Sequence, residues 1–249
     1  MSPNGRQRKE VMRNTMTVQS DVYVIILLTV IIGIAFVVLS KILDKADPLE
    51  EPKGVVRLVV LGATAVYNTV RSNVGSKTAD HLTPYIIVLW VYIFMANTIS
   101  LFGLQSPTAN LSVTLLLAFL TWLCIQYTEL KYGGLKSYLH AFFEPLAVMF
   151  PMNVIGKFST MVSMSLRLFG NITCGGIMMQ LIYAAAQGLS NMIAGWFGAS
   201  GSVFNFMAPI LTPILHAYFD LFAGFIQTLV FVTLTIVLIG NDMPDEVKD

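Results

Sequence analysis

Two apolar stretches near the end of the chain each carry a row of polar residues. In the first, Thr160, Ser163, Arg167 and Asn171 are spaced by three or four residues, which places them on one face of a helix. Arginine keeps its charge, and a charge in the middle of a bilayer costs free energy. Ionisable residues inside a membrane usually mark ion pathways. Arg167 is therefore the first candidate for function.

The second stretch repeats the pattern with different chemistry. His216, Asp220, Gly224 and Gln227 are spaced by four, four and three residues, again one helical face. Asp220 and Arg167 are the formal charges that lie deep in these stretches. One face offers a fixed cation and an amide, whereas the other offers a titratable carboxylate, an imidazole and an amide. These groups suit the movement of an ion.

Two other interpretations use the same residues. Arg167 and Asp220 would form a buried ion pair in a structural membrane scaffold, although buried pairs stabilise poorly compared with apolar packing. Small polar residues such as Ser163 also promote helix contacts without transport. Alternatively, Arg167 would bind an anion in a secondary transporter. Such folds usually show internal repeats and broken helices, and the sequence shows neither.

Composition sets the class of protein. The 249 residues are 55% hydrophobic and 12% charged, with a mean hydropathy of +0.72 and a net charge of +1. A soluble domain carries about twice that share of charge, so we predict a polytopic membrane protein. The small net charge argues against nucleic acid as a partner. No cofactor or metal site is expected, because two cysteines and three histidines are scattered and no phosphate-binding glycine loop occurs.

The chain divides into segments that predict an all-α membrane protein with five transmembrane helices and one interfacial helix. The stretch 22–40 is long enough to span a bilayer, whereas the charged pattern at 54–77 favours an interfacial helix. The predicted segments are a polar tail (1–21), a first transmembrane helix (22–40), a cytoplasmic loop with the interfacial helix (41–82), a transmembrane hairpin (83–130), a cytoplasmic loop (131–145), two long helices carrying the ion pathway (146–240) and a C-terminal tail (241–249).

The last two helices are too long for an upright span. Each apolar run would measure roughly 55–60 Å, about twice the hydrocarbon thickness. Each run is therefore either broken into two pieces or steeply tilted, and we predict tilt. Lysine and arginine are concentrated in the loops at 41–77 and 131–157. The basic N-terminal tail argues the other way, but the two loops outweigh it, so the positive-inside rule predicts an N-terminus outside and a C-terminus in the cytoplasm.

Several motifs resemble one family over about 83–240. "SLRLFGN" around Arg167, followed by a glycine pair, is similar to the signature of the a subunit of F-type ATP synthases. "PTANLSVTLLLA", "YGGLKSYLHAFFEP" and "YFDLFAGFIQTLVFVTLTIVLI" resemble further segments of that family in order and spacing. The resemblance implies a non-catalytic ion-channel subunit, whose two long helices lie tilted against a rotating ring of c subunits.

The resemblance also implies roles and surroundings. Arg167 would be the stator charge that faces a carboxylate of each passing c subunit, between two offset aqueous half-channels. The complex would include the c ring and peripheral-stalk b subunits, within lipid, in the cell inner membrane or an equivalent energy-coupling membrane. The ion would be H⁺ or Na⁺, with H⁺ as our prediction.

Roles in the half-channels follow from the same resemblance. Asp220 would relay protons in the outer half-channel, Asn171 and Gln227 would line it, and His216 would lie at its mouth. The chain departs from many relatives in having Gly176 where they have glutamate.

The inner half-channel departs from relatives too. Gly156 and Lys157 stand where many relatives have an acidic residue. Glu144, Ser159 or bulk water is the expected substitute for that carboxylate. The remaining residues expected to line the pathway are Thr160 and Ser163.

Overall fold

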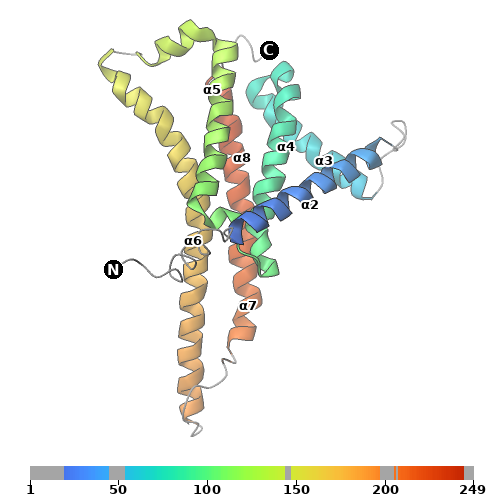
Figure 1. Cartoon of the computed structure of the whole chain (residues 1–249), viewed down its shortest axis with the longest axis vertical. Coiled ribbons are helices and arrows are strands. Elements are labelled where there is room, and N and C mark those ends of the chain that lie inside the picture. The colour runs from blue at the N-terminus through green and yellow to red at the C-terminus, as the bar shows by residue number, and fades with distance from the viewer. Residues whose placement is uncertain (1–19, 45–53, 144–146, 197–204, 206, 244–249) are drawn as a thin grey trace, which may run out of the picture.

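A computed structural model describes residues 20–44, 54–143, 147–196, 205 and 207–243. The described residues form helices and turns without a strand, which confirms the all-α prediction (Figure 1). The helices are α2 (Ser20–Leu43), α3 (Val55–Val74), α4 (Ser76–Thr98), α5 (Leu111–Ala141), α6 (Phe150–Trp196), α7 (Ala208–His216) and α8 (Gly224–Asn241), with a π-helical segment (Ala217–Ala223) joining α7 to α8.

Five helical stretches among the described residues are long and apolar enough to cross a membrane. They are Val22–Leu43, Ser76–Phe102, Leu111–Lys136, Phe150–Trp196 and Ala208–Asn241. The α3 helix is not among them, and it combines an apolar face with Arg57 and Arg71. The five candidate spans confirm the predicted number, and the interfacial position of α3 stays a prediction.

Helix ends differ from the segment boundaries at two places. The α4 helix begins at Ser76, because Gly75 alone, at a φ of 79°, turns the chain between α3 and α4. The α5 helix runs on to Ala141, through the stretch predicted as a loop, with a kink at Gly134 where φ is 74°. Positive φ favours glycine, so both changes of direction occur where the sequence permits them.

The α6 helix is continuous over 47 residues. At about 1.5 Å per residue it is about 70 Å long, more than twice the hydrocarbon thickness. The sequence predicted that this run is either broken into two pieces or steeply tilted. The unbroken α6 excludes the first alternative. The second run differs, because the π-helical segment Ala217–Ala223 interrupts it directly after His216. Figure 1 shows α6 beside the α7–α8 column over much of its length.

The main hydrophobic core is formed by α3, α4, α5, α6 and α8. Its buried members include one residue from each of these helices, Val70, Ile93, Ile125, Leu168 and Phe231. Gly240 allows α8 to touch the backbone of α3, because a Cβ there would stand 2.7 Å from the carbonyl oxygen of Asn73. Close packing at this junction fixes α8, which forms one wall of the cavity beside Arg167.

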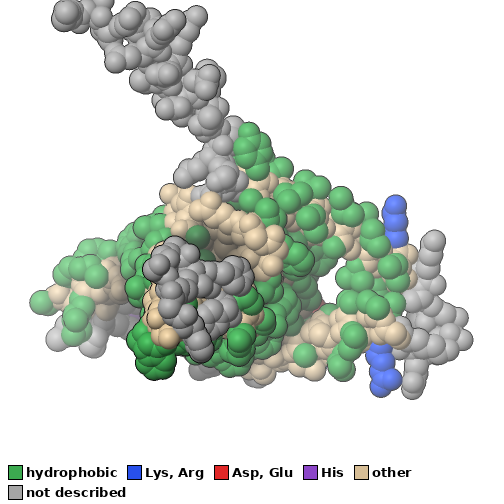
Figure 2. All heavy atoms as spheres, turned by 90° about the horizontal axis from the view of Figure 1, so that it is seen from below, with side chains coloured by type: hydrophobic (Ala, Val, Ile, Leu, Met, Phe, Trp, Pro, Cys, Tyr) green, Lys and Arg blue, Asp and Glu red, His purple; other side chains and the backbone are tan. Residues whose placement is uncertain are grey.

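The outer surface is largely apolar. Large hydrophobic side chains such as Tyr23, Ile34, Leu116 and Ile177 are exposed. Figure 2 shows hydrophobic side chains over much of the visible described surface, with lysine and arginine at one edge. Soluble proteins rarely expose apolar area on this scale. These surfaces suit contact with lipid or with other membrane helices.

Candidate functional site

Arg167 lies in the middle of α6 and is exposed on the surface of the chain. Among the described residues, no carboxylate lies within ion-pair distance of its guanidinium. A permanent charge on a membrane-spanning helix needs compensation from water or from an opposite charge. Because its own chain supplies no partner in the described part, the position is open to a group from outside the chain.

A cavity of about 280 Å³ adjoins Arg167. Ser159, Thr160 and Ser163 line it from α6, and Leu234 and Leu238 line it from α8. The structure therefore brings three sequence candidates together with Arg167. The Thr160 hydroxyl donates a hydrogen bond to the carbonyl of Gly156 at 3.2 Å. The hydroxyl groups of this cavity thus lie beside a cation that has no carboxylate partner among the described residues.

Asp220 is paired within its own helix. Its Oδ2 lies 2.5 Å from Nδ1 of His216, one turn earlier. Asp220 is buried, whereas the His216 side chain is about one-third exposed, at 33%. The buried carboxylate therefore contacts an imidazole that reaches toward the surface. An Arg167–Asp220 pair, as the scaffold interpretation requires, is absent from the structure.

A second cavity, of about 410 Å³, lies beside Asp220. Its walls come from the end of α4 and the following turn, from α6 and from the π-helical segment. Ser100 and Ser106 line it from the segment between α4 and α5. Thr173 and Gly176 line it from α6, and Asp220 lines it from the π-helical segment. Gly176, the position of the missing glutamate, thus faces the same cavity as Asp220.

Asn171 and Gln227 carry buried amide groups. The Nδ2 atom of Asn171 and the Nε2 atom of Gln227 have no hydrogen-bond partner in the described part of the chain. A buried donor without an acceptor costs free energy. Such donors on α6 and α8 are available to water or to a partner group. Glu144, the remaining sequence candidate, lies outside the described residues.

The two cavities lie on different sides of α6. Gly176 is nine residues beyond Arg167, so at about 3.6 residues per turn it lies on the opposite side of the helix. The rise of about 1.5 Å per residue separates the two positions by about 13 Å along the axis. The Arg167 cavity and the Asp220 cavity are therefore offset both around and along α6.

The family model for the ATP synthase A chain matches residues 22–240. The chain belongs to the F-type ATP synthase subunit a family. It is 32% identical to "ATP synthase subunit a, sodium ion specific" of Propionigenium modestum over 178 residues, which are 65% of this chain and 54% of that protein. It thus spans about half the length of that relative.

The chain matches a larger share of the length of other subunit a relatives. The chain is 28% identical to ATP synthase subunit a of Priestia megaterium over 229 residues, which are 88% of this chain and 92% of that protein. The protein of the same name from Mycoplasmoides gallisepticum is 32% identical over 203 residues, which are 77% of this chain and 67% of that protein. With its five candidate spans, this subunit a is a multi-pass membrane protein.

Sequence reasoning missed the network that positions the π-helical segment of subunit a. The Nδ2 atom of Asn97 donates to the carbonyl of Gly224 at 3.3 Å and to the Thr228 hydroxyl at 3.4 Å. The Thr108 hydroxyl donates to Oδ1 of Asn97 at 2.9 Å. Gly224 lets this approach occur, because a Cβ there would stand 3.1 Å from the Cβ of Asn97. Buried asparagine in an apolar span was the available sequence signal.

Sequence reasoning also missed an ion pair near the start of α6. The Nζ atom of Lys157 contacts the carboxylate of Glu129 on α5. Trp122 donates its indole N–H to the carbonyl of Lys157 at 3.0 Å. Lys157 stood out in the sequence as a departure from relatives, but Glu129 did not. The pair joins α5 to the start of α6.

Proposed function

We propose that this chain is the ion-translocating stator subunit of a rotary F-type ATP synthase, with Arg167 as the stator charge. The observation that carries the proposal is the exposed guanidinium in the middle of α6, with no carboxylate partner in the described part of the chain. A partner from outside must compensate it. A ring of c subunits that each present a membrane-embedded carboxylate would do so in turn.

Arg167 controls the protonation of the passing carboxylate. An opposite charge nearby lowers the pKa of a carboxylic acid by about 1–3 units. Each ring carboxylate therefore releases its proton on reaching Arg167 and takes up another after leaving it. Arg167 also keeps protons from crossing directly between the two half-channels. Ion flow is coupled to rotation in this way, and the chemistry of ATP takes place in other chains.

The two cavities serve as the half-channels. The turn between α4 and α5 lines the Asp220 cavity. By the predicted topology, this turn faces the outside of the membrane. The Arg167 cavity opens toward the start of α6, on the cytoplasmic side. Asp220 relays protons with His216 at the mouth, while Asn171 and Gln227 offer amides to water in the pathway. Ser159, Thr160 and Ser163 line the inner side.

The surroundings follow from this role. The c ring covers the Arg167 face of α6, and peripheral-stalk b subunits hold the chain still against it. Apolar surface elsewhere lies in lipid. The membrane is the cell inner membrane or an equivalent energy-coupling membrane. We propose H⁺ as the transported ion, since a carboxylate 2.5 Å from an imidazole suits proton transfer.

We predict that a pH gradient alone drives ATP synthesis by this complex. The complex is reconstituted in liposomes, and an acid pulse is applied in sodium-free buffer with a clamped membrane potential. Synthesis measured with luciferase should occur without Na⁺. An imposed Na⁺ gradient at equal pH on both sides should give none. Synthesis driven by the Na⁺ gradient alone would contradict the proton assignment and leave the stator role to be tested separately.

A further inference from the structure

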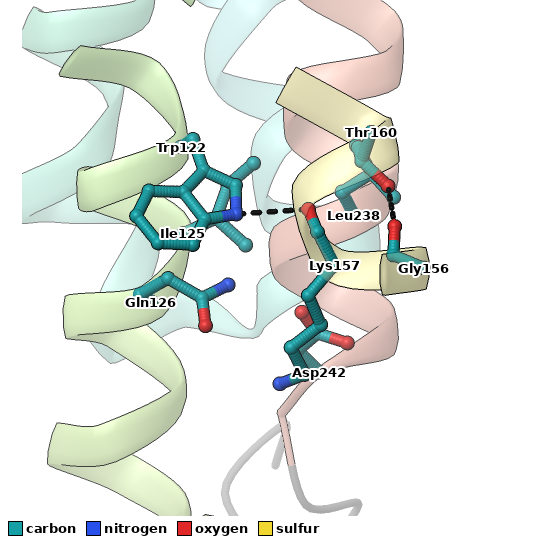
Figure 3. A pocket seen from close by; sticks show the side chains of 8 residues that line it. All are labelled: Trp122, Ile125, Gln126, Gly156, Lys157, Thr160, Leu238 and Asp242. Carbon is teal, nitrogen blue, oxygen red and sulfur yellow. Dashed lines mark hydrogen bonds between the residues drawn. The ribbon is translucent and has the colours of Figure 1, made fainter. Parts of the chain in front are cut away.

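A small cavity lies where α5, the start of α6 and the end of α8 meet (Figure 3). Its volume is about 130 Å³. Trp122 and Gln126 line it from α5, and Figure 3 shows Lys157, Thr160 and Asp242 on the opposite side. On the proposed topology it faces the cytoplasm. We call it the Asp242 cavity.

The Asp242 cavity adjoins the Arg167 cavity. Thr160 and Leu238 form part of the wall of both. The two volumes of about 130 and 280 Å³ have room for several water molecules, each of which occupies about 30 Å³ in the liquid. A proton that reaches the Asp242 cavity is therefore next to the space beside the stator charge.

Lys157 is held in place at the side of the Asp242 cavity. Its ammonium group pairs with Glu129. The same nitrogen lies 4.7 Å from the ring centre of Tyr138 and 5.1 Å from that of Phe142. With the Trp122 hydrogen bond to its carbonyl, Lys157 is constrained at both ends. It supplies a fixed positive charge rather than a mobile group.

Asp242 is a partly buried carboxylate at the end of α8. Among the described residues, no side-chain hydrogen bond or ion-pair contact reaches it. The charged and titratable groups that act on it are Lys157 from α6 and Glu129 and Tyr138 from α5. Burial raises the pKa of Asp242, and the charge of Lys157 opposes that rise. The protonated form of this carboxyl is thereby more accessible than that of an aspartate in water.

We propose that Asp242 is the carboxylate that exchanges protons between the cytoplasm and the Arg167 cavity. The proposal rests on the proposed function and names the group that replaces the acidic residue missing at Gly156 and Lys157. The ionised carboxylate accepts a proton from water at the cavity mouth. It then releases that proton to water in the Arg167 cavity, from which the ring carboxylate takes it up. Asp242 returns to its ionised form, which Lys157 favours.

The test uses the whole complex in inside-out membrane vesicles, where the cytoplasmic face is in the medium. In Asp242→Asn, ATP-driven acidification should fall by about tenfold at high external pH and only about twofold at low pH, because a proton-collecting group matters most when protons are scarce. Asp242→Glu should restore the rate and its pH profile. Asp44→Asn, a carboxylate at the end of α2 beside a different cavity, should match wild type.

The outcomes separate two failures. Wild-type pumping in the same vesicles tests the proposed function by itself, and its absence would count against that function. Suppose that wild type pumps and that Asp242→Asn loses the same share of pumping at every pH. If Asp242→Glu does not restore this loss, the relay is overturned. An unchanged Asp242→Asn rate and pH profile would overturn it too. A loss confined to high pH, with rescue by glutamate, would support it.

Discussion

Replacing Arg167 by alanine will reduce ATP-driven ion pumping by the assembled complex by at least about tenfold. The ring carboxylate then meets no positive charge, so its pKa stays high and it keeps its proton. An opposite charge lowers such a pKa by about 1–3 units, and each unit changes the ionised fraction tenfold. We therefore expect proton release to slow by about ten- to thousandfold. Passive proton leak should rise, because the barrier between the half-channels is gone.

The measurement is acidification of inside-out vesicles at matched levels of assembled complex. ATP hydrolysis by the detached catalytic head should continue at the wild-type rate. Arg57→Ala, which removes one positive charge from exposed α3, is the control and should pump normally. Pumping that survives in Arg167→Ala would leave this arginine a structural charge and remove the basis of the stator role.

Replacing Asp220 by asparagine will give the second-largest loss. Asparagine keeps the shape of the side chain but cannot carry a proton through the second cavity. Positioned acid–base groups contribute about 10²–10⁴-fold to proton transfer, and water in the 410 Å³ cavity replaces part of that. We expect pumping and ATP synthesis to fall by about ten- to a hundredfold, with assembly unchanged.

His216→Gln provides the matched comparison, because each variant changes one partner of the same 2.5 Å contact. A relay through Asp220 requires Asp220→Asn to lose much more flux than His216→Gln. If the pair were only structural, both variants would lose complex from the membrane to a similar extent. Quantifying assembled complex by immunoblot alongside flux distinguishes these results. Equal flux per complex in Asp220→Asn and wild type would contradict the relay.

Features that depend on local spacing could be predicted from the sequence. Arg167 and the hydroxyls of Thr160 and Ser163 share one side of α6, since helical periodicity alone places them there. The His216–Asp220 contact likewise follows from a spacing of four residues. The five spans follow from length and hydropathy. Each of these features uses information contained within one helix.

Features that depend on packing between helices could not be predicted from the sequence. Lys157 and Glu129 are 28 residues apart, and Asn97 and Gly224 are 127 apart. Nothing in the local pattern indicates which residues of other helices they meet. The π-helical segment differs from an α-helix by small changes in backbone angle, so the apolar pattern at Ala217–Ala223 did not reveal it. The separation of Asp220 from Arg167 into different cavities depends on the same packing.

One measurement tests the central claim most directly: disulfide formation between the Arg167 face of α6 and the rotor. Ser163, one turn from Arg167 and exposed, is changed to cysteine after Cys124 and Cys174 are replaced by alanine. A second cysteine is placed one turn from the ring carboxylate, and Leu120→Cys on exposed α5 is the control.

We predict that oxidation joins position 163 to the ring, stops ATP-driven pumping, and is reversed by reduction, while the position 120 variant stays unlinked. Linkage to the ring from position 120 and none from position 163 would contradict the placement of Arg167 against the rotor.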